Sequence, residues 1–180
     1  MTATRARITE PHRRLRLAGT VAGVGLKSVL AGHGTDARRR RAQVCGAARL
    51  LTAAGVRVRV VAPPTAWPRS GRLVVSGSLG RLDELAVLTA VPRSATGWTQ
   101  LAERALLGRA VTPPPPDRPE EALLPVAVRY RREGDPGWLS GAFVPRDLAH
   151  ALAVPGLVVE VRLLPALRPG REARPEAAAG

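Results

Sequence analysis

Residues 71–92 read GRLVVSGSLGRLDELAVLTAVP, and this stretch decides the fold class that the sequence predicts. Its apolar run at 73–75 is long enough for a buried strand and too short for a helix. The glycines and serines at 76–80 favour a loop. Residues 82–91 then predict a helix, with Asp83 and the glutamate after it in the first turn, where the helix dipole favours negative charge. A strand, a glycine-rich loop and such a helix are typical of the place where an α/β protein carries its chemistry.

The chain on either side of this stretch predicts further elements of the same class. Residues 36–54 have apolar positions at helical spacing, with Asp36 placed to cap the helix and Gly55 placed to end it. Other helices are predicted at 97–109 and 145–152, and strands at 56–61, 123–130, 138–144 and 156–164. Because strands alternate with helices, we expect one α/β domain over residues 36–167, with a mixed or mainly parallel sheet flanked by helices. Neighbouring strands of that sheet should carry Val58, Val74, Val126 and Val159.

The segments outside this domain differ from it in composition. Residues 1–35 begin with basic side chains and continue into an uncharged run at 17–26, shorter than the about 20 apolar residues of a membrane span. We expect a short helix that lies on a membrane surface or packs on the domain, and an ordinary surface helix behind a frayed basic tail is an equal alternative. A secretory signal is a further interpretation, although no convincing small-residue cleavage site follows. Residues 168–180, rich in Pro, Arg and Ala, predict a disordered tail.

The charge balance favours anionic partners. The 180 residues include 28 Lys and Arg against 14 Asp and Glu, which gives a formal net charge of +14. Such a charge attracts phospholipid surfaces, nucleic acids and acidic ligands. Without a helix-turn-helix, zinc-finger or aromatic stacking motif, we expect no specific nucleic-acid partner. The single cysteine, Cys45, excludes an internal disulfide and a cysteine-based metal cluster, and we expect it to be a small buried residue of the helix at 36–54.

A run of four arginines stands in the first turns of that helix: Arg38, Arg39, Arg40 and Arg41. A charge run of this kind is most often a solvated helix face. The alternative is contact with phospholipid headgroups, because the uncharged segment of the chain lies just before it. Arginines in a first helical turn oppose the helix dipole, which argues against a purely stabilising role.

Several stretches resemble the glycerolipid acyltransferases, the family of 1-acyl-sn-glycerol-3-phosphate acyltransferase. Residues 71–92 are similar to the first motif of that family, a buried strand followed by Asn-His, four residues and an Asp at the head of a helix; the Asp position falls on Asp83. The stretch RRRRAQVCGAARLLTAAGVRVRV, at 38–60, resembles the entry into the family's sheet. LLPVAVRYR, at 123–131, resembles the Pro-Val strand after the active site, and residues 141–167 resemble the closing helix and strand.

This resemblance implies an acyltransferase-like fold and a role in phospholipid biosynthesis. The implied reaction moves an acyl group from acyl-CoA or acyl carrier protein to a lysophospholipid hydroxyl, with no other cofactor and no metal. The implied location is the cytoplasm, peripheral on the inner face of the membrane. Asp83 would be the catalytic carboxylate, and the candidates for contact with a substrate or headgroup are Arg81 and the run Arg38, Arg39, Arg40 and Arg41.

The departures from the family pattern bear on activity. The histidine position of the first motif falls on Ser78, and a serine hydroxyl cannot accept a proton near neutral pH as the histidine base does. The Glu-Gly-Thr motif that binds the acceptor is absent, and the middle of the family's domain is reduced to residues 93–122. The remaining histidines, His12, His33 and His150, lie in flanking segments or on the late helix.

We therefore expect acyl transfer to be weak or lost. One alternative is a catalytically inactive relative that still binds lipid or membrane, and another is a truncated gene product. A nucleic-acid binder is less favoured, because charge alone supports it. In a purely structural interpretation, Asp83 is a helix cap and Ser78 an ordinary loop residue.

Overall fold

The computed structural model describes residues 19–20, 35–75, 79–108, 121–145 and 147–167. Apart from residues 19–20, the predicted N-terminal segment up to residue 34 lies outside this part, as does the predicted tail at 168–180. The elements follow in the order α2 (Asp36–Ala53), β1 (Arg57–Val61), β2 (Arg72–Val75), α3 (Arg81–Ala90), α4 (Trp98–Leu107), β3 (Leu123–Arg132), a 3₁₀ helix (Gly141–Phe143), α5 (Leu148–Leu152) and β4 (Leu157–Leu163).

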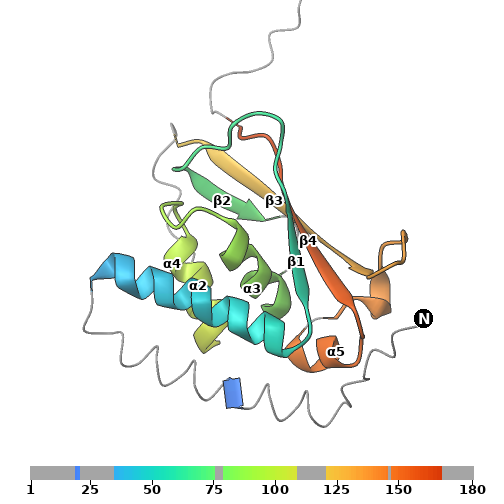
Figure 1. Ribbon diagram of the computed structural model, residues 1–180. Coiled ribbons are helices and arrows are strands. Elements are labelled where there is room, and N and C mark those ends of the chain that lie inside the picture. The colour runs from blue at the N-terminus through green and yellow to red at the C-terminus, as the bar shows by residue number, and fades with distance from the viewer. Residues whose placement is uncertain (1–18, 21–34, 76–78, 109–120, 146, 168–180) are drawn as a thin grey trace, which may run out of the picture.

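The four strands form one mixed sheet in the order β1-β4-β3-β2. β1 runs parallel to β4 and β2 parallel to β3, whereas β3 and β4 are antiparallel. Val58 pairs with Val159, and β2 and β3 carry Val74 and Val126, so the predicted α/β class and the shared sheet are confirmed. Helices α2, α3 and α4 gather on one side of the sheet (Figure 1).

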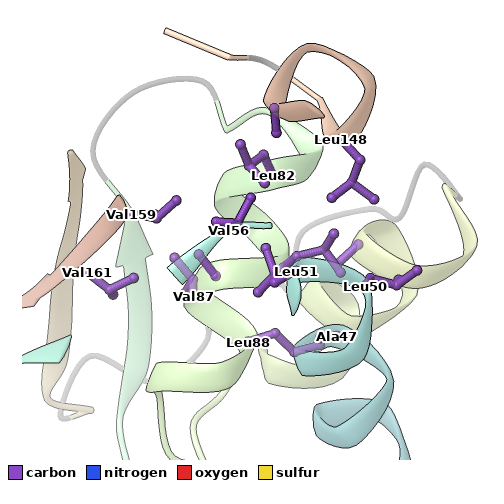
Figure 2. Close-up of a cluster of buried hydrophobic side chains, with 14 of the residues drawn as sticks. Ala47, Leu50, Leu51, Val56, Leu82, Val87, Leu88, Leu148, Val159 and Val161 are labelled. Carbon is purple, nitrogen blue, oxygen red and sulfur yellow. The ribbon is translucent and has the colours of Figure 1, made fainter. Parts of the chain in front are cut away.

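The hydrophobic core lies between these helices and the sheet (Figure 2). α2 contributes Leu50 and Leu51, α3 contributes Leu82 and Leu88, and β4 contributes Val159 and Val161. These six side chains are at most 3% exposed. Burial of one such side chain is worth about 1.5–3 kcal/mol relative to exposure, so this layer accounts for much of the stability of the fold.

Gly71 is needed where β2 begins. Its φ is +144°, and a Cβ at this position would lie 2.6 Å from the carbonyl oxygen of Ala122. The Arg72 N–H donates to that same carbonyl, so the chain before β3 lies directly against the start of β2. Only glycine permits so close an approach in this backbone conformation.

Two predicted strands are less buried than their apolar sequences indicated. β1 and β2 are the two edge strands of the sheet, and β2 leaves Val74 41% exposed. On β1, Val58 is half-buried and Val60 is exposed. An edge strand has a neighbour on one side only, which explains why a short apolar run here is not enclosed.

The segment between β3 and β4 departs from the prediction. The strand predicted at 138–144 is wrong: this stretch bends into the 3₁₀ helix, and Gly141 has a φ of +58°, which interrupts extended backbone. The helix predicted from Pro145 begins only at Leu148, because Asp147 is its N-cap and accepts a hydrogen bond from the His150 N–H.

Details of α2 also differ from expectation. Thr35, not Asp36, occupies the N-cap; its carbonyl accepts from the Arg39 N–H at 3.0 Å, but its side chain makes no capping hydrogen bond. Cys45 is exposed rather than buried, since the buried positions of α2, such as Ala47 and Leu50, lie on a different face of the helix. Gly55 ends the helix as predicted, with a φ of +75°.

Candidate functional site

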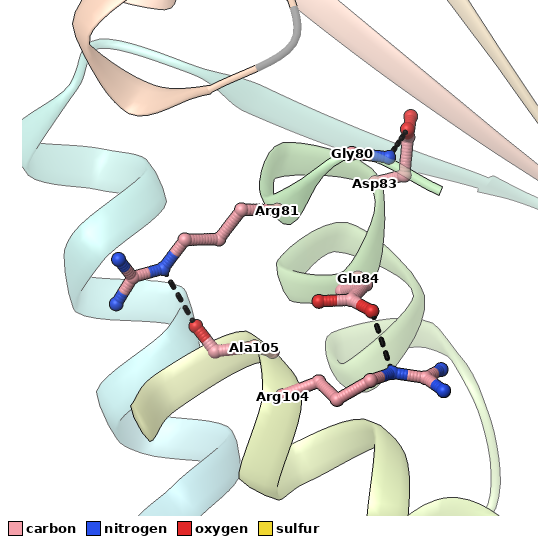
Figure 3. A network of polar contacts seen from close by, with 6 residues as sticks. All are labelled: Gly80, Arg81, Asp83, Glu84, Arg104 and Ala105. Carbon is pink, nitrogen blue, oxygen red and sulfur yellow. Dashed lines mark hydrogen bonds and ion pairs between the residues drawn. The ribbon is translucent and has the colours of Figure 1, made fainter. Parts of the chain in front are cut away.

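Asp83 lies in the first turn of α3, directly after the loop that follows β2. Gly80 is the N-cap of this helix, and its N–H donates to Asp83 Oδ2 at 2.7 Å. This bond satisfies one of the backbone N–H groups at the N-terminus of the helix (Figure 3). One of the two carboxylate oxygens of Asp83 therefore caps the helix, as the purely structural interpretation expects.

The other oxygen of Asp83 accepts a hydrogen bond from the hydroxyl of Tyr130. Tyr130 lies on β3, faces the helices and is 4% exposed. Burial raises the pKa of Asp83, while the bonds from Tyr130 and Gly80 lower it, and the pKa remains above the usual aspartate range. Burial, together with the neighbouring Asp83 charge, raises the pKa of Tyr130, so the phenol stays neutral and acts as a donor.

This pair lines a pocket of about 340 Å³. Arg129 and Trp138 contribute a guanidinium group and an indole ring, and the apolar lining consists of Leu79, Val128, Leu139 and Val144. None of the described residues that line the pocket is a histidine. The pocket can therefore hold an apolar chain beside one carboxylate and one guanidinium, but among its described residues only the carboxylate could act as a base near neutral pH.

Arg81, a predicted substrate contact, is used to join two helices. Its Nε donates to the carbonyl of Ala105 at 3.0 Å, near the C-terminal end of α4 (Figure 3). A terminal nitrogen of the same guanidinium donates to the carbonyl of Leu106 at 3.2 Å. Guanidinium groups are favoured there because the last carbonyls of a helix lack partners. Arg81 is not among the residues that line the Asp83 pocket.

A partly buried ion pair joins the same two helices. Arg104 Nε lies 2.8 Å from Glu84 Oε1, and the Glu84 side chain is 11% exposed (Figure 3). Burial raises the pKa of Glu84, and the charge of Arg104 opposes that rise. Because Glu84 is adjacent to Asp83, this pair and the bonds of Arg81 hold the N-terminal turn of α3 against α4.

The arginine run at the start of α2 lies away from the Asp83 pocket. Arg40 donates to the carbonyl of Arg93 at 2.8 Å, and Arg39 pairs with Glu103 at 3.8 Å. Arg93 follows the C-terminal end of α3, whereas Asp83 is at the other end of that helix, about 15 Å away for ten residues. Arg38 and Arg41 are exposed on the surface.

The other predicted site residues are placed as follows. Ser78, His12 and His33 lie outside the described residues. His150 is on α5, where its Nδ1 lies 3.0 Å from Asp147 Oδ1 and its side chain is 71% exposed. The backbone N–H of His150 lowers the pKa of Asp147, with smaller contributions from the imidazole. This pair caps α5 and does not line the Asp83 pocket.

Two residues of the site were missed by the sequence analysis, Tyr130 and Trp138. The alternation of side chains along the strand predicted at 123–130 contained a signal for Tyr130. Tyr130 lies on the same strand face as Val126 and Val128, and this face points towards the core. Nothing in the sequence paired Tyr130 with Asp83, since that contact arises from the parallel pairing of β2 and β3.

Comparison with known proteins finds no matching family model, and no curated protein or solved structure matches the chain. Among the described helices, none combines the length and the apolar character that crossing a bilayer requires.

Proposed function

We propose that the protein is an acyltransferase-like lipid-binding protein that transfers acyl groups from acyl thioesters to lysophospholipids very slowly or not at all. The observation that carries the proposal is the bonding of Asp83. This carboxylate stands after a strand and a glycine-rich loop, in a largely apolar pocket, but it accepts from Tyr130 and Gly80. The position of the carboxylate is the one that the family resemblance implies, and its partner is a neutral phenol instead of an imidazole.

The chemistry of acyl transfer explains the low activity. The lysophospholipid hydroxyl must lose a proton as it attacks the thioester, and a positioned general base contributes about 10²–10⁴-fold to the rate. Tyr130 cannot act as this base, because its raised pKa keeps the phenol protonated. Asp83 is a weak base even with its raised pKa, so any residual transfer would depend on it.

Lipid binding without turnover is the second candidate, and the lining of the pocket favours it. Leu79, Val128 and Leu139 offer an apolar surface, and Arg129 offers a charge for a phosphate group. A lysophospholipid has both features. On this proposal the protein acts at the inner face of the membrane, and the headgroup contact is Arg129 in place of Arg81 or the run at 38–41.

The proposal is tested by assaying the purified chain with acyl-CoA and lysophosphatidate. We expect turnover far below the roughly 1 s⁻¹ of ordinary enzymes. Any activity that is measurable should be lost in Asp83→Asn. Asp147→Asn is the matched control, because it removes a carboxylate from the α5 cap. Ser78→His should restore little activity, since the acceptor motif remains absent. Ordinary turnover that survives Asp83→Asn would place the active site elsewhere.

Lipid binding is measured separately with a fluorescent lysophospholipid. Val128→Phe should fill part of the pocket and weaken binding, whereas Val60→Phe adds the same bulk at an exposed position of β1 and should not. Equal binding by both variants would contradict a lipid site beside Asp83.

A further inference from the structure

The side of the sheet opposite the helices carries a set of arginines. Paired residues of neighbouring strands point to the same side of a sheet, and side chains alternate along each strand. The pairs Arg59–Glu160 and Glu160–Arg129 therefore place these three residues together on the side away from Val159 and Val161. The same register defines the arginine face: Arg57, Arg59, Arg72, Arg129, Arg131 and Arg162.

The arginine face has a large excess of positive charge. The four strands contain seven arginines and one acidic residue, Glu160. Glu160 is 3% exposed and pairs with Arg162 at 2.6 Å, and Arg57 pairs with Glu133 beyond the end of β3. Within the described part of the chain, neither Arg59 nor Arg131 forms an ion pair. Such a concentration of like charge is costly for the folded chain and is relieved by an anionic partner.

Apolar side chains are exposed on the same face. Trp138 is 40% exposed, and the guanidinium carbons of Arg129 and Arg162 each lie 5.6 Å from the centre of its ring. Val74, on the same side of β2, is 41% exposed. Tryptophan beside arginine is the composition that favours the interface between lipid headgroups and acyl chains.

The arginine face also borders the Asp83 pocket. Arg129 and Trp138 belong to both, because they line the pocket and also meet over the outer side of the sheet. A surface bound by this face would therefore lie at the rim of the pocket.

We infer that the arginine face docks on an anionic phospholipid bilayer. The array of guanidinium groups matches the phosphates of a bilayer surface, and Trp138 and Val74 can enter the headgroup layer beside them. A single-stranded nucleic acid fits less well, because Arg129 and Arg162 already lie over the Trp138 ring, where a base would have to stack. Docking does not depend on acyl transfer, so it can hold when the proposed function fails.

The main test is sedimentation with vesicles of phosphatidylcholine alone and of phosphatidylcholine mixed with phosphatidylglycerol. The test variant is Arg57→Gln, Arg59→Gln, Arg131→Gln, which leaves Arg129, the proposed headgroup contact of the pocket, in place. Its matched control, Arg49→Gln, Arg93→Gln, Arg69→Gln, removes the same charge from exposed positions on α2, after α3 and in the loop before β2. Each arginine near an anionic surface contributes about fivefold to binding, so the test variant should bind mixed vesicles about 100-fold more weakly than wild type. The control should lose much less, because its charges lie off the arginine face, on α2 and beside the C-terminal end of α3, and salt screens charges farther from the bilayer than a Debye length of about 8 Å.

A spectroscopic measurement identifies the side that docks. The chain has three tryptophans, and the variant Trp67→Phe, Trp98→Phe leaves Trp138 as the single one. Its emission should shift to the blue with mixed vesicles and be quenched by brominated phospholipids. Circular dichroism of every variant verifies that it is folded.

Several outcomes would overturn the inference. These are equal binding to both kinds of vesicle, no binding, an equal loss in the control, or an unchanged Trp138 spectrum on bound vesicles. Retained binding by the test variant together with loss on replacing Arg38, Arg39, Arg40 and Arg41 would move the docking site to α2. A labelled single-stranded oligonucleotide that binds through the arginine face, when vesicles do not, would assign the face to nucleic acid.

Discussion

The two sides of the sheet are built from alternate residues of the same strands and differ in almost every property. On β4, Val159 and Val161 point to the helices and are fully buried, while Glu160 and Arg162 point the other way. On β3, Tyr130 meets Asp83 on the helix side, and its neighbours Arg129 and Arg131 belong to the arginine face. The difference indicates that the helix side carries the stability of the fold, while the outer side is the one for which we infer a partner.

The largest expected effect is a difference in the free energy of unfolding when the same substitution is made on each side of the sheet. Val161→Ala removes two methyl groups from a fully buried position and should lower the free energy of unfolding by about 2 kcal/mol, from lost transfer energy and an unfilled cavity. Val74→Ala makes the same change on the outer side, where the residue is 41% exposed, and should cost about 0.5 kcal/mol or less. Urea unfolding monitored by circular dichroism measures both, and equal losses would refute the comparison.

Much of this architecture could be predicted from the sequence because it depends on local patterns. The apolar runs at 73–75 and 156–164 and the helical spacing of 36–54 located two strands and a helix. The segment 138–144 was mispredicted because its apolar content resembles a strand while Gly141 imposes a turn. Cys45 was wrongly predicted to be buried, because the burial of a residue on a helix depends on which neighbouring elements pack against its face.

The site and the arginine face depend on strand order, which the sequence does not encode locally. Arg59, Arg129 and Arg162 are far apart along the chain and become neighbours only because β4 lies between β1 and β3. Asp83 could be singled out from its place after a strand and loop, whereas its partner Tyr130 could not. Which side of the sheet the helices cover also decides whether these arginines are exposed, and local sequence patterns do not determine that.

A smaller effect is expected where the helix side meets the pocket. Tyr130→Phe removes the donor to Asp83 and should lower the free energy of unfolding at neutral pH by about 1.5 kcal/mol, because an ionised acceptor loses its hydrogen bond. The bond lowers the pKa of Asp83, so the variant should raise that pKa further. Carbon-detected NMR titration of the Asp83 carboxyl measures the shift.

The pH dependence of this variant has a definite sign. In wild type the folded pKa of Asp83 is above the unfolded value, so the folded state takes up the proton first and the Asp83 contribution to stability improves as pH falls through the folded pKa. The Tyr130 bond is worth most while Asp83 is ionised. The difference between wild type and Tyr130→Phe should therefore be largest near neutral pH and shrink as Asp83 is protonated. A difference that grows on acidification would exclude this account.

The smallest effect concerns Glu160, the single acid among the strand residues. Glu160→Gln keeps a polar side chain beside Arg162 but removes the negative charge from the centre of the arginine face. Binding to phosphatidylglycerol vesicles should become up to about fivefold tighter, because one opposing charge is lost near the bilayer. Stability should change by about 1 kcal/mol or less, since Arg162 is 40% exposed and can be solvated.

Glu103→Gln makes the same change on α4, where Glu103 pairs with Arg39 at 3.8 Å, and should leave vesicle binding nearly unchanged. If Glu103→Gln tightened binding as much as Glu160→Gln, net charge and not the outer side of the sheet would account for attraction to the membrane.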